Sequence, residues 1–253
     1  MRHHPSIGVV IPAFHAADDL HRTLSAFQAL PDDVQSRLEV AVMDGGSTDR
    51  TLEVVSTFAS LVKHTVSQQD AGVYDAMNRG AREIQSPFVW FMGAGDLPHA
   101  HGLSALLDRL HDAPHDGHAC GVQAMTPREP GVPETFDPRF GRGLNWRNTL
   151  HHQGLVVPTD WIQNAPFSTA YRVLADYAWI LDRRNEGKHI HCHPEVVLAS
   201  VSGGGLSRQF RPALYREEHR LKKGRVTGVV RLAHLVWLPA KWAFKQMSKA
   251  RSI

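Results

Sequence analysis

The sequence is poor in cysteine and contains no long hydrophobic run. Its 253 residues include only Cys120 and Cys192, which lack CxxC spacing, so a disulfide framework or a structural zinc site is not expected. No stretch reaches the ~18 consecutive apolar residues of a transmembrane helix. Residues 1–5 lead directly into the apolar segment 7–11, without the hydrophobic region of a signal peptide. We therefore expect a protein of the reducing cytosol that is neither secreted nor membrane-spanning.

The two commonest glycine-rich phosphate-binding motifs are also absent. The chain has neither a GxGxxG fingerprint nor a P-loop, which disfavours a Rossmann-type dehydrogenase and a nucleoside triphosphatase. Its hydrophobic content of 42% and charged content of 21% are typical of a soluble globular protein. A length of 253 residues suits one α/β domain followed by a tail.

Basic charge is concentrated near the C-terminal end. Residues 211–253 contain 11 Lys and Arg, with Glu217 and Glu218 as their acids, which amounts to a net charge of +9. Because the whole chain carries +3, the first 210 residues carry a net charge of −6. A nucleic-acid enzyme more often has basic charge across its working face. We therefore expect no nucleic-acid partner and interpret the basic end as an attachment segment.

The first hundred residues alternate short apolar runs with helix-like stretches. Strands are predicted over residues 7–12, 38–43, 61–66 and 88–92, with helices over 18–30, 49–60 and 73–84 between them. Further along we expect helices over 102–111 and 176–185, and strands over 119–125, 154–157 and 195–201. Strict alternation predicts parallel strands, right-handed crossovers and helices on both faces. The predicted fold class is a doubly wound, mostly parallel α/β sheet.

In such sheets, ligands bind in the crevice at the carboxyl ends of the strands. One loop at these ends lies in Asp44-Gly45-Gly46-Ser47-Thr48-Asp49, which follows a predicted strand and starts a predicted helix. Glycine permits a tight turn, Ser, Thr or Asp can cap the helix, and a carboxylate can accept hydrogen bonds from a ring N–H or ribose hydroxyls. These residues alone are equally consistent with a capped turn and with a nucleotide contact.

Further segments of this kind follow in a fixed order. They are Gln69-Asp70-Ala71-Gly72-Val73-Tyr74-Asp75-Ala76-Met77-Asn78-Arg79-Gly80, Phe91-Met92-Gly93-Ala94-Gly95-Asp96, His151-His152-Gln153 and Ala175-Asp176-Tyr177. With Ile11-Pro12-Ala13-Phe14 and the Asp44 loop, this ordered set resembles family 2 glycosyltransferases of the GT-A fold over residues 6–207. The similarity is nearest to bacterial members that build exopolysaccharide or lipid-linked saccharide. It implies a GT-A catalytic domain over residues 1–210 and a basic helical tail over 211–253.

The resemblance also implies roles for individual residues. The nucleotide-sugar pocket would be formed by Pro12, Ala13, Asp44, Gly45, Asp70 and Gly95, with Asp44 reading the edge of the base. Asp96 would hold Mg²⁺ or Mn²⁺ against the donor diphosphate, and Asp176 would be the catalytic base of an inverting reaction. His152 and Gln153 would lie near the leaving group or the acceptor.

The chain departs from the family pattern at two places. Where relatives commonly have Asp-x-Asp or Asp-Asp, this chain has Gly93-Ala94-Gly95-Asp96 and so a single carboxylate. His15 stands where Asn is common after the first strand. Asp96 would also suit a turn, Asp176 a helix N-cap, and Asp70 the N-terminal dipole of a helix. His189, His191 and His193 alternate along a predicted strand, where we expect a solvated face rather than a zinc site.

These observations predict a cytoplasmic enzyme that transfers a sugar, with inversion, from a nucleotide-sugar donor to a saccharide or lipid-linked acceptor. A catalytically silent nucleotide-sugar binding protein is the alternative, since the metal motif is reduced. Cationic residues beside Trp and Leu over residues 225–249 favour a helix lying on the inner face of the cell membrane. A helix docked on the catalytic domain, with its apolar side inward, is the other interpretation of this segment.

Overall fold

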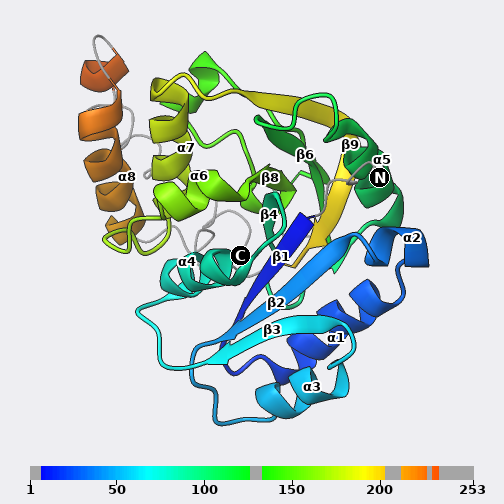
Figure 1. Ribbon diagram of the computed structural model, residues 1–253. Coiled ribbons are helices and arrows are strands. Elements are labelled where there is room, and N and C mark those ends of the chain that lie inside the picture. Colours follow the sequence, from blue (N-terminus) through cyan, green and yellow to red (C-terminus); the bar gives the residue numbers. More distant parts are fainter. Residues whose placement is uncertain (1–6, 126–132, 203–211, 227–229, 234–253) are drawn as a thin grey trace.

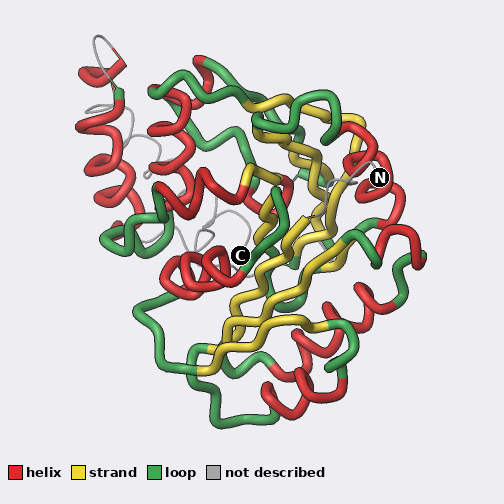
Figure 2. The backbone as a smooth tube through the Cα atoms, viewed as in Figure 1, coloured by secondary structure: helices red, strands yellow, loops and turns green. Residues whose placement is uncertain are grey.

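The computed structural model describes residues 7–125, 133–202, 212–226 and 230–233 (Figure 1). Within them, the strands form one sheet in the order β3-β2-β1-β4-β8-β6-β9-β5, and β7 pairs with β6 outside this path. The strands are β1 (Ile7–Ala13), β2 (Leu38–Asp44), β3 (Val62–Ser67), β4 (Phe88–Phe91), β5 (Leu97–Pro98), β6 (Gly117–Ala124), β7 (Thr135–Phe136), β8 (Leu155–Pro158) and β9 (Ile190–Val201). Helices lie on both sides of the sheet (Figure 2). The predicted α/β class is confirmed.

The N-terminal half contains the parallel strands. β1 pairs in parallel with β2 and with β4, and β2 pairs in parallel with β3. The crossover helices are α1 (Ala17–Gln28), α2 (Asp32–Gln35), α3 (Thr51–Thr57) and α4 (Val73–Glu83). Pro12 is level with Met43, and Ala13 with Asp44, so the loops after β1 and β2 begin side by side. After β1 the chain forms β2 and β3 on one side of it, and β4 then pairs with β1 on the other side. The carboxyl end of β1 is therefore the topological switch point, where ligands bind in such sheets.

The C-terminal half of the sheet is mixed. β8 is antiparallel to both β4 and β6, β9 is parallel to β6, and β5 is antiparallel to β9. The remaining elements here are α5 (Ala100–Arg109), α6 (Thr159–Asn164), α7 (Ala175–Asn185) and the short 3₁₀ turns η1 (Arg142–Asn145) and η2 (His152–Gly154). The predicted strand over 195–201 begins earlier, at Ile190. The short elements α2, α6, β5 and β7 were not predicted, because so few residues show no clear periodicity.

Two hydrophobic layers cover the sheet. Val9 and Ile11 of β1 pack with Phe27 of α1 and with side chains of α3 and α5. Val10, between them in sequence, packs on the opposite face with Met77 of α4 and with side chains of α6 and α7. Successive strand side chains point to opposite faces, so a strand buried on both faces is apolar throughout, as the β1 sequence is.

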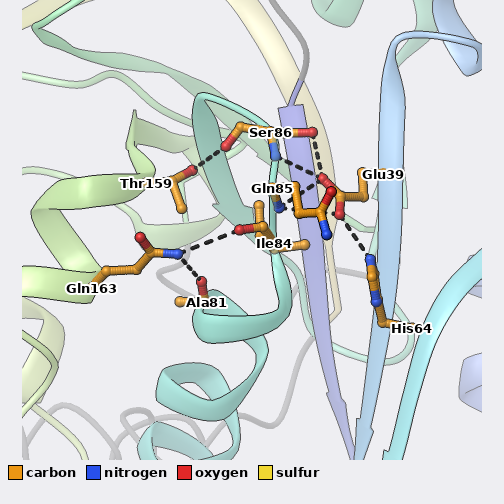
Figure 3. Close-up of polar contacts among 8 residues, drawn as sticks. All are labelled: Glu39, His64, Ala81, Ile84, Gln85, Ser86, Thr159 and Gln163. Atoms are coloured by element: carbon orange, nitrogen blue, oxygen red, sulfur yellow. Dashed lines mark hydrogen bonds and ion pairs between the residues drawn. The ribbon is translucent and has the colours of Figure 1, made fainter.

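A polar cluster anchors the end of the sheet opposite the predicted ligand loops (Figure 3). Near the start of β2, Glu39 accepts hydrogen bonds from the N–H groups of Gln85 and Ser86 and from Ser86 Oγ, and His64 Nε2 lies 2.8 Å from its Oε1. Burial acts to raise the pKa of Glu39, but these hydrogen bonds outweigh it and hold the pKa below its ordinary value. Gln163 of α6 donates to the last carbonyls of α4. The connection from α4 to β4 is thereby fixed to β2 and α6.

The helix α8 (Pro212–Arg225) is the part of the predicted tail that the structure describes most fully. It lies alongside α7, where Arg225 forms an ion pair with Asp182 (2.8 Å) and a buried Lys222–Glu218 pair (2.7 Å) supports the contact (Figure 1). Most of the segment 225–249, predicted to lie on a membrane, is outside the described residues. Among the helices that the structure does describe, none is both long and apolar enough to cross a bilayer.

The close approach of α5 to β9 leads to a stability prediction. A Cβ at Gly102 would lie 1.9 Å from the Val197 carbonyl oxygen, whereas a Cβ at Gly224 of α8 would meet nothing within 4 Å. Ala favours a helix over Gly by roughly 1 kcal/mol, but overpacking against backbone costs about 1–3 kcal/mol or more. We expect Gly102→Ala to lower the urea unfolding midpoint and Gly224→Ala to leave it equal or higher. Equal midpoints for both variants would contradict this packing.

Candidate active site

The Asp44 loop shapes itself around its own carboxylate. Asp44 is 1% exposed, and its Oδ2 accepts hydrogen bonds from Ser67 Oγ (2.6 Å), Ser47 N (3.0 Å) and Gly46 N (3.1 Å). Burial acts to raise the pKa of Asp44, yet these hydrogen bonds prevail and the pKa is lowered. The ionised carboxylate therefore holds the turn at the end of β2. Whether it also contacts a base stays a prediction.

Backbone N–H groups after β1 donate hydrogen bonds to side-chain hydroxyls of the segment after β2. His15 N donates to Ser47 Oγ (2.8 Å), and Ala16 N donates to Thr51 Oγ1 (3.0 Å). His15 has a φ of 48°, the left-handed region that Asn, Asp and His enter more readily than other side chains. This explains why a residue of that group follows the first strand. Pro12, Ala13 and Gly45 are adjacent in the structure, since Gly45 N donates to Ala13 O at 2.9 Å.

Asp70 and Phe14 border the same small space. A Cβ at Gly45 would lie 2.8 Å from Asp70 Oδ2 and 3.2 Å from Phe14 Cδ2. Asp70 Oδ1 accepts a hydrogen bond from Gly72 N (2.8 Å), and Arg79 Nη2 of α4 lies 3.8 Å from Asp70 Oδ2. Phe14 is 62% exposed, unusual for so large an apolar side chain. The structure therefore brings Ala13, Gly45 and Asp70 together and adds the exposed ring of Phe14, whereas Gly95, also predicted for this pocket, lies in the Asp96 loop beside Thr23.

Asp96 lies in the loop after β4, almost fully buried. Its Oδ2 accepts hydrogen bonds from Gly93 N (2.9 Å) and Gln153 Nε2 (3.0 Å), and its Oδ1 accepts one from Ser202 N (2.9 Å). Desolvation by burial raises the pKa of Asp96 above its ordinary value, against the effect of these donors. Thr23 of α1 fixes the loop, donating to Asp96 O (2.9 Å) and accepting from Gly95 N (2.8 Å).

The structure shows why glycine suits positions 93 and 95, before Asp96. A Cβ at Gly93 would lie 2.8 Å from Asp96 Oδ2, so a larger residue there would press on the carboxylate. Gly95 has a φ of 98°, which strains any side chain. The conformation of Gly95 therefore disfavours a second acid directly before Asp96.

Oxygen donors near Asp96 fit a divalent cation held by few protein ligands. Gln153 Oε1 is buried and accepts no hydrogen bond from the described residues, while its amide nitrogen faces Asp96. Mg²⁺ is commonly bound through one or two carboxylates together with substrate phosphates and water. Across the described residues, no group of three or more His, Cys, Asp or Glu side chains is arranged to hold a metal on its own. Of the alternating histidines near the start of β9, His191 pairs with Asp116 (2.9 Å), and His193 lies 3.2 Å from His118.

The short turn η2 links Asp96 to Asp176. Gln153 Nε2 donates to Asp96, and the preceding residue, His152, places its Nδ1 3.7 Å from Asp176 Oδ2. Trp90 of β4 holds the turn, since its Nε1 donates to Gln153 O (2.8 Å). Burial lowers the pKa of His152 to about 4, so its imidazole is neutral at physiological pH. Two consecutive side chains thus span the space between the predicted metal ligand and the predicted base.

Asp176 lies in the first turn of α7, with Leu174 at the N-cap, so it is not the capping residue. Tyr74 of α4 places its hydroxyl 2.9 Å from Asp176 Oδ1 and 2.6 Å from Val173 O. Desolvation raises the pKa of Asp176, while the Tyr74 hydrogen bond and the Tyr177 backbone act to lower it. The pKa of Tyr74 is raised well above its ordinary value, mainly by burial and to a smaller extent by the charge of Asp176. The result is a desolvated carboxylate beside a neutral imidazole and a neutral phenol.

Four residues that the sequence did not single out complete this site. Tyr74, Thr23 and Ser202 hold the two buried carboxylates, and Phe14 borders the pocket. Tyr74 and Phe14 lie inside the quoted motifs, but their roles depend on contacts across the fold. The sequence did show Phe14 at the end of a strand, but an aromatic residue in that place can be either exposed or buried.

The raised pKa of Asp176 leads to a prediction about stability. A carboxyl whose pKa is higher in the folded state contributes stability below its unfolded pKa and loses it as pH rises through the folded pKa. Asp176→Asn removes this ionisation, so we expect its melting temperature to exceed that of the wild type increasingly as pH rises from acidic to neutral. Thermal unfolding followed by circular dichroism across this pH range measures the difference. The exposed Asp112→Asn is the control, and parallel behaviour of the two variants would contradict the buried environment.

Sequence relatives of the chain are glycosyltransferases. It is 29% identical over 210 residues to the PGL/p-HBAD biosynthesis glycosyltransferase of Mycobacterium bovis (strain BCG), covering 80% of this chain and 79% of that protein. It is 24% identical over 224 residues to glycosyltransferase AglE of Haloferax volcanii, covering 82% of this chain and 71% of that protein. Both proteins therefore align with most of the chain.

Solved structures show the same fold. S. aureus TarS 1–349 in complex with UDP-GlcNAc superposes with a TM-score of 0.70 at 16% identity, covering 96% of this chain and 73% of that one. The mannosyltransferase PcManGT from Pyrobaculum calidifontis, in complex with GDP-Man and Mn²⁺, superposes with a TM-score of 0.65 at 18% identity, covering 94% and 70%. The family profile described as Glycosyl transferase family 2 matches residues 8–163, which include the Asp44 loop, Asp96 and the His152–Gln153 turn. The chain belongs to glycosyl transferase family 2 and is a glycosyltransferase with the GT-A fold.

Proposed function

We propose that this protein transfers a sugar, in a single inverting displacement, from a nucleoside-diphosphate sugar to a hydroxyl of a saccharide or lipid-linked acceptor. The observation that carries the proposal is the η2 turn, where Gln153 contacts Asp96 and His152 contacts Asp176. A leaving diphosphate held at Asp96 and an acceptor hydroxyl held at Asp176 would then lie on opposite sides of one sugar ring. That arrangement suits attack from the face opposite the leaving group.

The donor nucleotide is proposed to occupy the space beside Gly45. Phe14 offers an exposed ring on which a base can stack, and Asp70 offers a carboxylate for ribose hydroxyls or a base N–H. The relatives support this class of donor, because TarS was solved with UDP-GlcNAc and PcManGT with GDP-Man. Pro12, Ala13 and Asp44 would form the floor of the pocket.

Asp176 is proposed as the general base. An acceptor hydroxyl must lose its proton as it attacks, and a carboxylate with a raised pKa is a better proton acceptor than an exposed one. His152, neutral beside it, can orient the acceptor without neutralising the Asp176 charge. Buried surroundings exclude water, which would otherwise compete with the acceptor.

Asp96 is proposed to hold a divalent cation, with the Gln153 side-chain oxygen as a second ligand. When bound, Mg²⁺ or Mn²⁺ would offset the negative charge that develops on the leaving diphosphate. Asp96 brings the negative charge for this ligation, and Thr23 and Ser202 keep its loop in place. PcManGT, which shares this fold, was solved with Mn²⁺, and this supports a divalent metal here.

A donor panel tests the transfer reaction and its metal. Purified protein is incubated with UDP-GlcNAc, UDP-glucose, GDP-mannose or a dTDP-sugar and Mn²⁺, with and without bacterial lipid extract, and nucleoside diphosphate release is measured. We expect release with one donor class, its loss on EDTA treatment, and a reduction of roughly 10²–10⁴-fold in Asp176→Asn. NMR of the product anomeric proton reports inversion.

The control for this panel is Asp112→Asn, which changes an exposed carboxylate outside the site. Wild-type release by Asp176→Asn would overturn the base assignment. Tight donor binding in calorimetry without any release, under all acceptor conditions, would instead favour a catalytically silent nucleotide-sugar binding protein.

The end of the chain is proposed to attach the enzyme to the inner face of the cell membrane. Residues 227–253 contain five Lys and Arg and no acidic residue, together with Trp237 and Trp242. Each basic residue near an anionic membrane surface contributes about 1 kcal/mol of attraction, and Trp side chains favour the interface. A surface position would bring a lipid-linked acceptor to the active site.

Vesicle flotation tests the attachment. Truncation after Val226 keeps α8 and removes residues 227–253, and circular dichroism checks that the truncated chain is folded. We expect the full chain to float with phosphatidylglycerol-containing vesicles at low salt and the truncated chain to stay behind. Equal flotation of both would remove the membrane proposal.

A further inference from the structure

The helix that carries Asp176 begins without a side-chain cap of its own. α7 starts at Ala175, and Leu174 at its N-cap makes no side-chain hydrogen bond to the helix. N–H groups at the start of a helix need partners from elsewhere, and anions near this end are favourable. The backbone of residues 172–174, which leads into the helix, finds its partner on another helix.

That partner is Glu217 of α8. Its carboxylate accepts hydrogen bonds from three consecutive backbone N–H groups, those of Arg172 (3.1 Å), Val173 (2.8 Å) and Leu174 (2.7 Å). Hydrogen bonds to a charged acceptor are shorter and stronger than those between neutral groups. One side chain therefore fixes the chain segment immediately before Asp176.

The Val173 peptide is held from both ends. Its N–H donates to Glu217, and its carbonyl accepts from the Tyr74 hydroxyl at 2.6 Å. The same hydroxyl lies 2.9 Å from Asp176 Oδ1. Because the phenol has a single proton, the position of the Val173 carbonyl decides how that proton is shared with Asp176. A shift of the segment would change the hydrogen bonding of the proposed base.

α8 is itself firmly placed on the catalytic fold. Arg225 makes two 2.8 Å contacts with Asp182 of α7, and Lys222 donates to Trp146 O at 2.9 Å. Arg220 donates to Ala170 O (2.7 Å), just before the segment that Glu217 holds. These contacts all follow Glu217 along the helix and hold α8 beside α7, so the Glu217 carboxylate is presented from a helix of fixed position (Figure 1).

We propose that Glu217 is a positioning residue for catalysis, which acts through the Val173 peptide and the Tyr74 hydroxyl to orient Asp176. The helix α8 lies beyond the segment 8–163 that matches the family, and by this inference it is part of the catalytic machinery. The inference rests on the proposed role of Asp176 as base. It assigns no contact with substrate to Glu217.

The test follows the ionisation of Asp176 directly, without a substrate. The protein is labelled with ¹³C at Asp carboxyl carbons, the Asp176 signal is identified from its absence in Asp176→Asn, and its titration is compared among variants by NMR. We expect Tyr74→Phe to move the Asp176 titration upward by up to about one pH unit, because it removes a hydrogen bond that favours the carboxylate. Glu217→Gln should move it downward, because a displaced Val173 carbonyl no longer competes with Asp176 for the Tyr74 proton. The double variant should move it no further than Tyr74→Phe alone.

The matched control is Glu186→Gln, a carboxylate-to-amide change at the other end of α7, where Glu186 pairs with Arg183 and is 49% exposed. It should leave the titration unchanged. Glu217→Asp, which keeps the charge on a shorter side chain, is expected to give an intermediate shift and replaces Glu217→Gln if that variant does not fold. A wild-type Asp176 titration in the folded Glu217 variant would overturn the inference.

Turnover with the donor identified in the panel gives the catalytic consequence. We expect kcat of Glu217→Gln to fall roughly 10- to 100-fold with an unchanged donor KM, since misplacing a catalytic group from a distance has effects of this size. The acid limb of its pH profile should move downward, in step with the Asp176 titration. Unchanged kcat in Glu217→Gln, with Asp176→Asn inactive, would overturn this inference alone. Wild-type turnover in Asp176→Asn would overturn the proposed function and this inference with it.

Discussion

The site depends on keeping two carboxylates buried close to one another. Burial raises the pKa of both Asp96 and Asp176, which means that desolvation disfavours their charged forms. Each is compensated by donors from separate parts of the chain: Gly93, Gln153 and Ser202 for Asp96, and Tyr74 for Asp176. The η2 turn lies between them and contacts both. The rest of the fold is arranged so that these donors arrive at one place.

The sheet supplies that arrangement through its topology. Parallel strands bring the loops after β1, β2 and β4 to the same edge, where the order of strands switches at β1. α1 connects two of these loops, because Ala17 N at its start donates to Asp49 Oδ2 and its Thr23 holds the Asp96 loop. The mixed half of the sheet then adds β8, which η2 precedes, so His152 and Gln153 enter from the other side. The predicted site residues thus come from both halves of one sheet.

Backbone geometry bears on two places where this chain departs from the family pattern. Gly95 adopts a φ of 98°, which strains a side chain directly before Asp96, and a Cβ at Gly93 would press on the Asp96 carboxylate. The proposed metal site relies on Asp96, Gln153 and the phosphates of the donor. In the same way, His15 occupies a left-handed position that few side chains tolerate. Both departures reflect the shape of the loops, which the residue pattern alone does not show.

Much of the parallel half was predictable from local patterns. Apolar runs such as 7–12 and 38–43 are buried on both faces, and the longer helices between the strands follow the period of a helix. The strands β1 to β4 and the helices α1, α3 and α4 were therefore anticipated to within a few residues. The antiparallel pairing of β8 was not, because strand direction depends on partners distant in sequence. The short α6 and β5 carry too few residues for periodicity to identify.

The sequence by itself determined which residue types stand at the strand ends, and the order of its motifs was sufficient to indicate the family. It could not determine which carboxylates are buried or what holds them. The Asp44 carboxylate accepts hydrogen bonds from N–H groups of its own loop. Asp176 instead has a hydrogen bond from Tyr74, about a hundred residues away in the chain, and the segment before its helix is bound by Glu217 of α8. Only the tertiary structure decided this difference, because burial and hydrogen bonding arise from contacts between elements that no local pattern specifies.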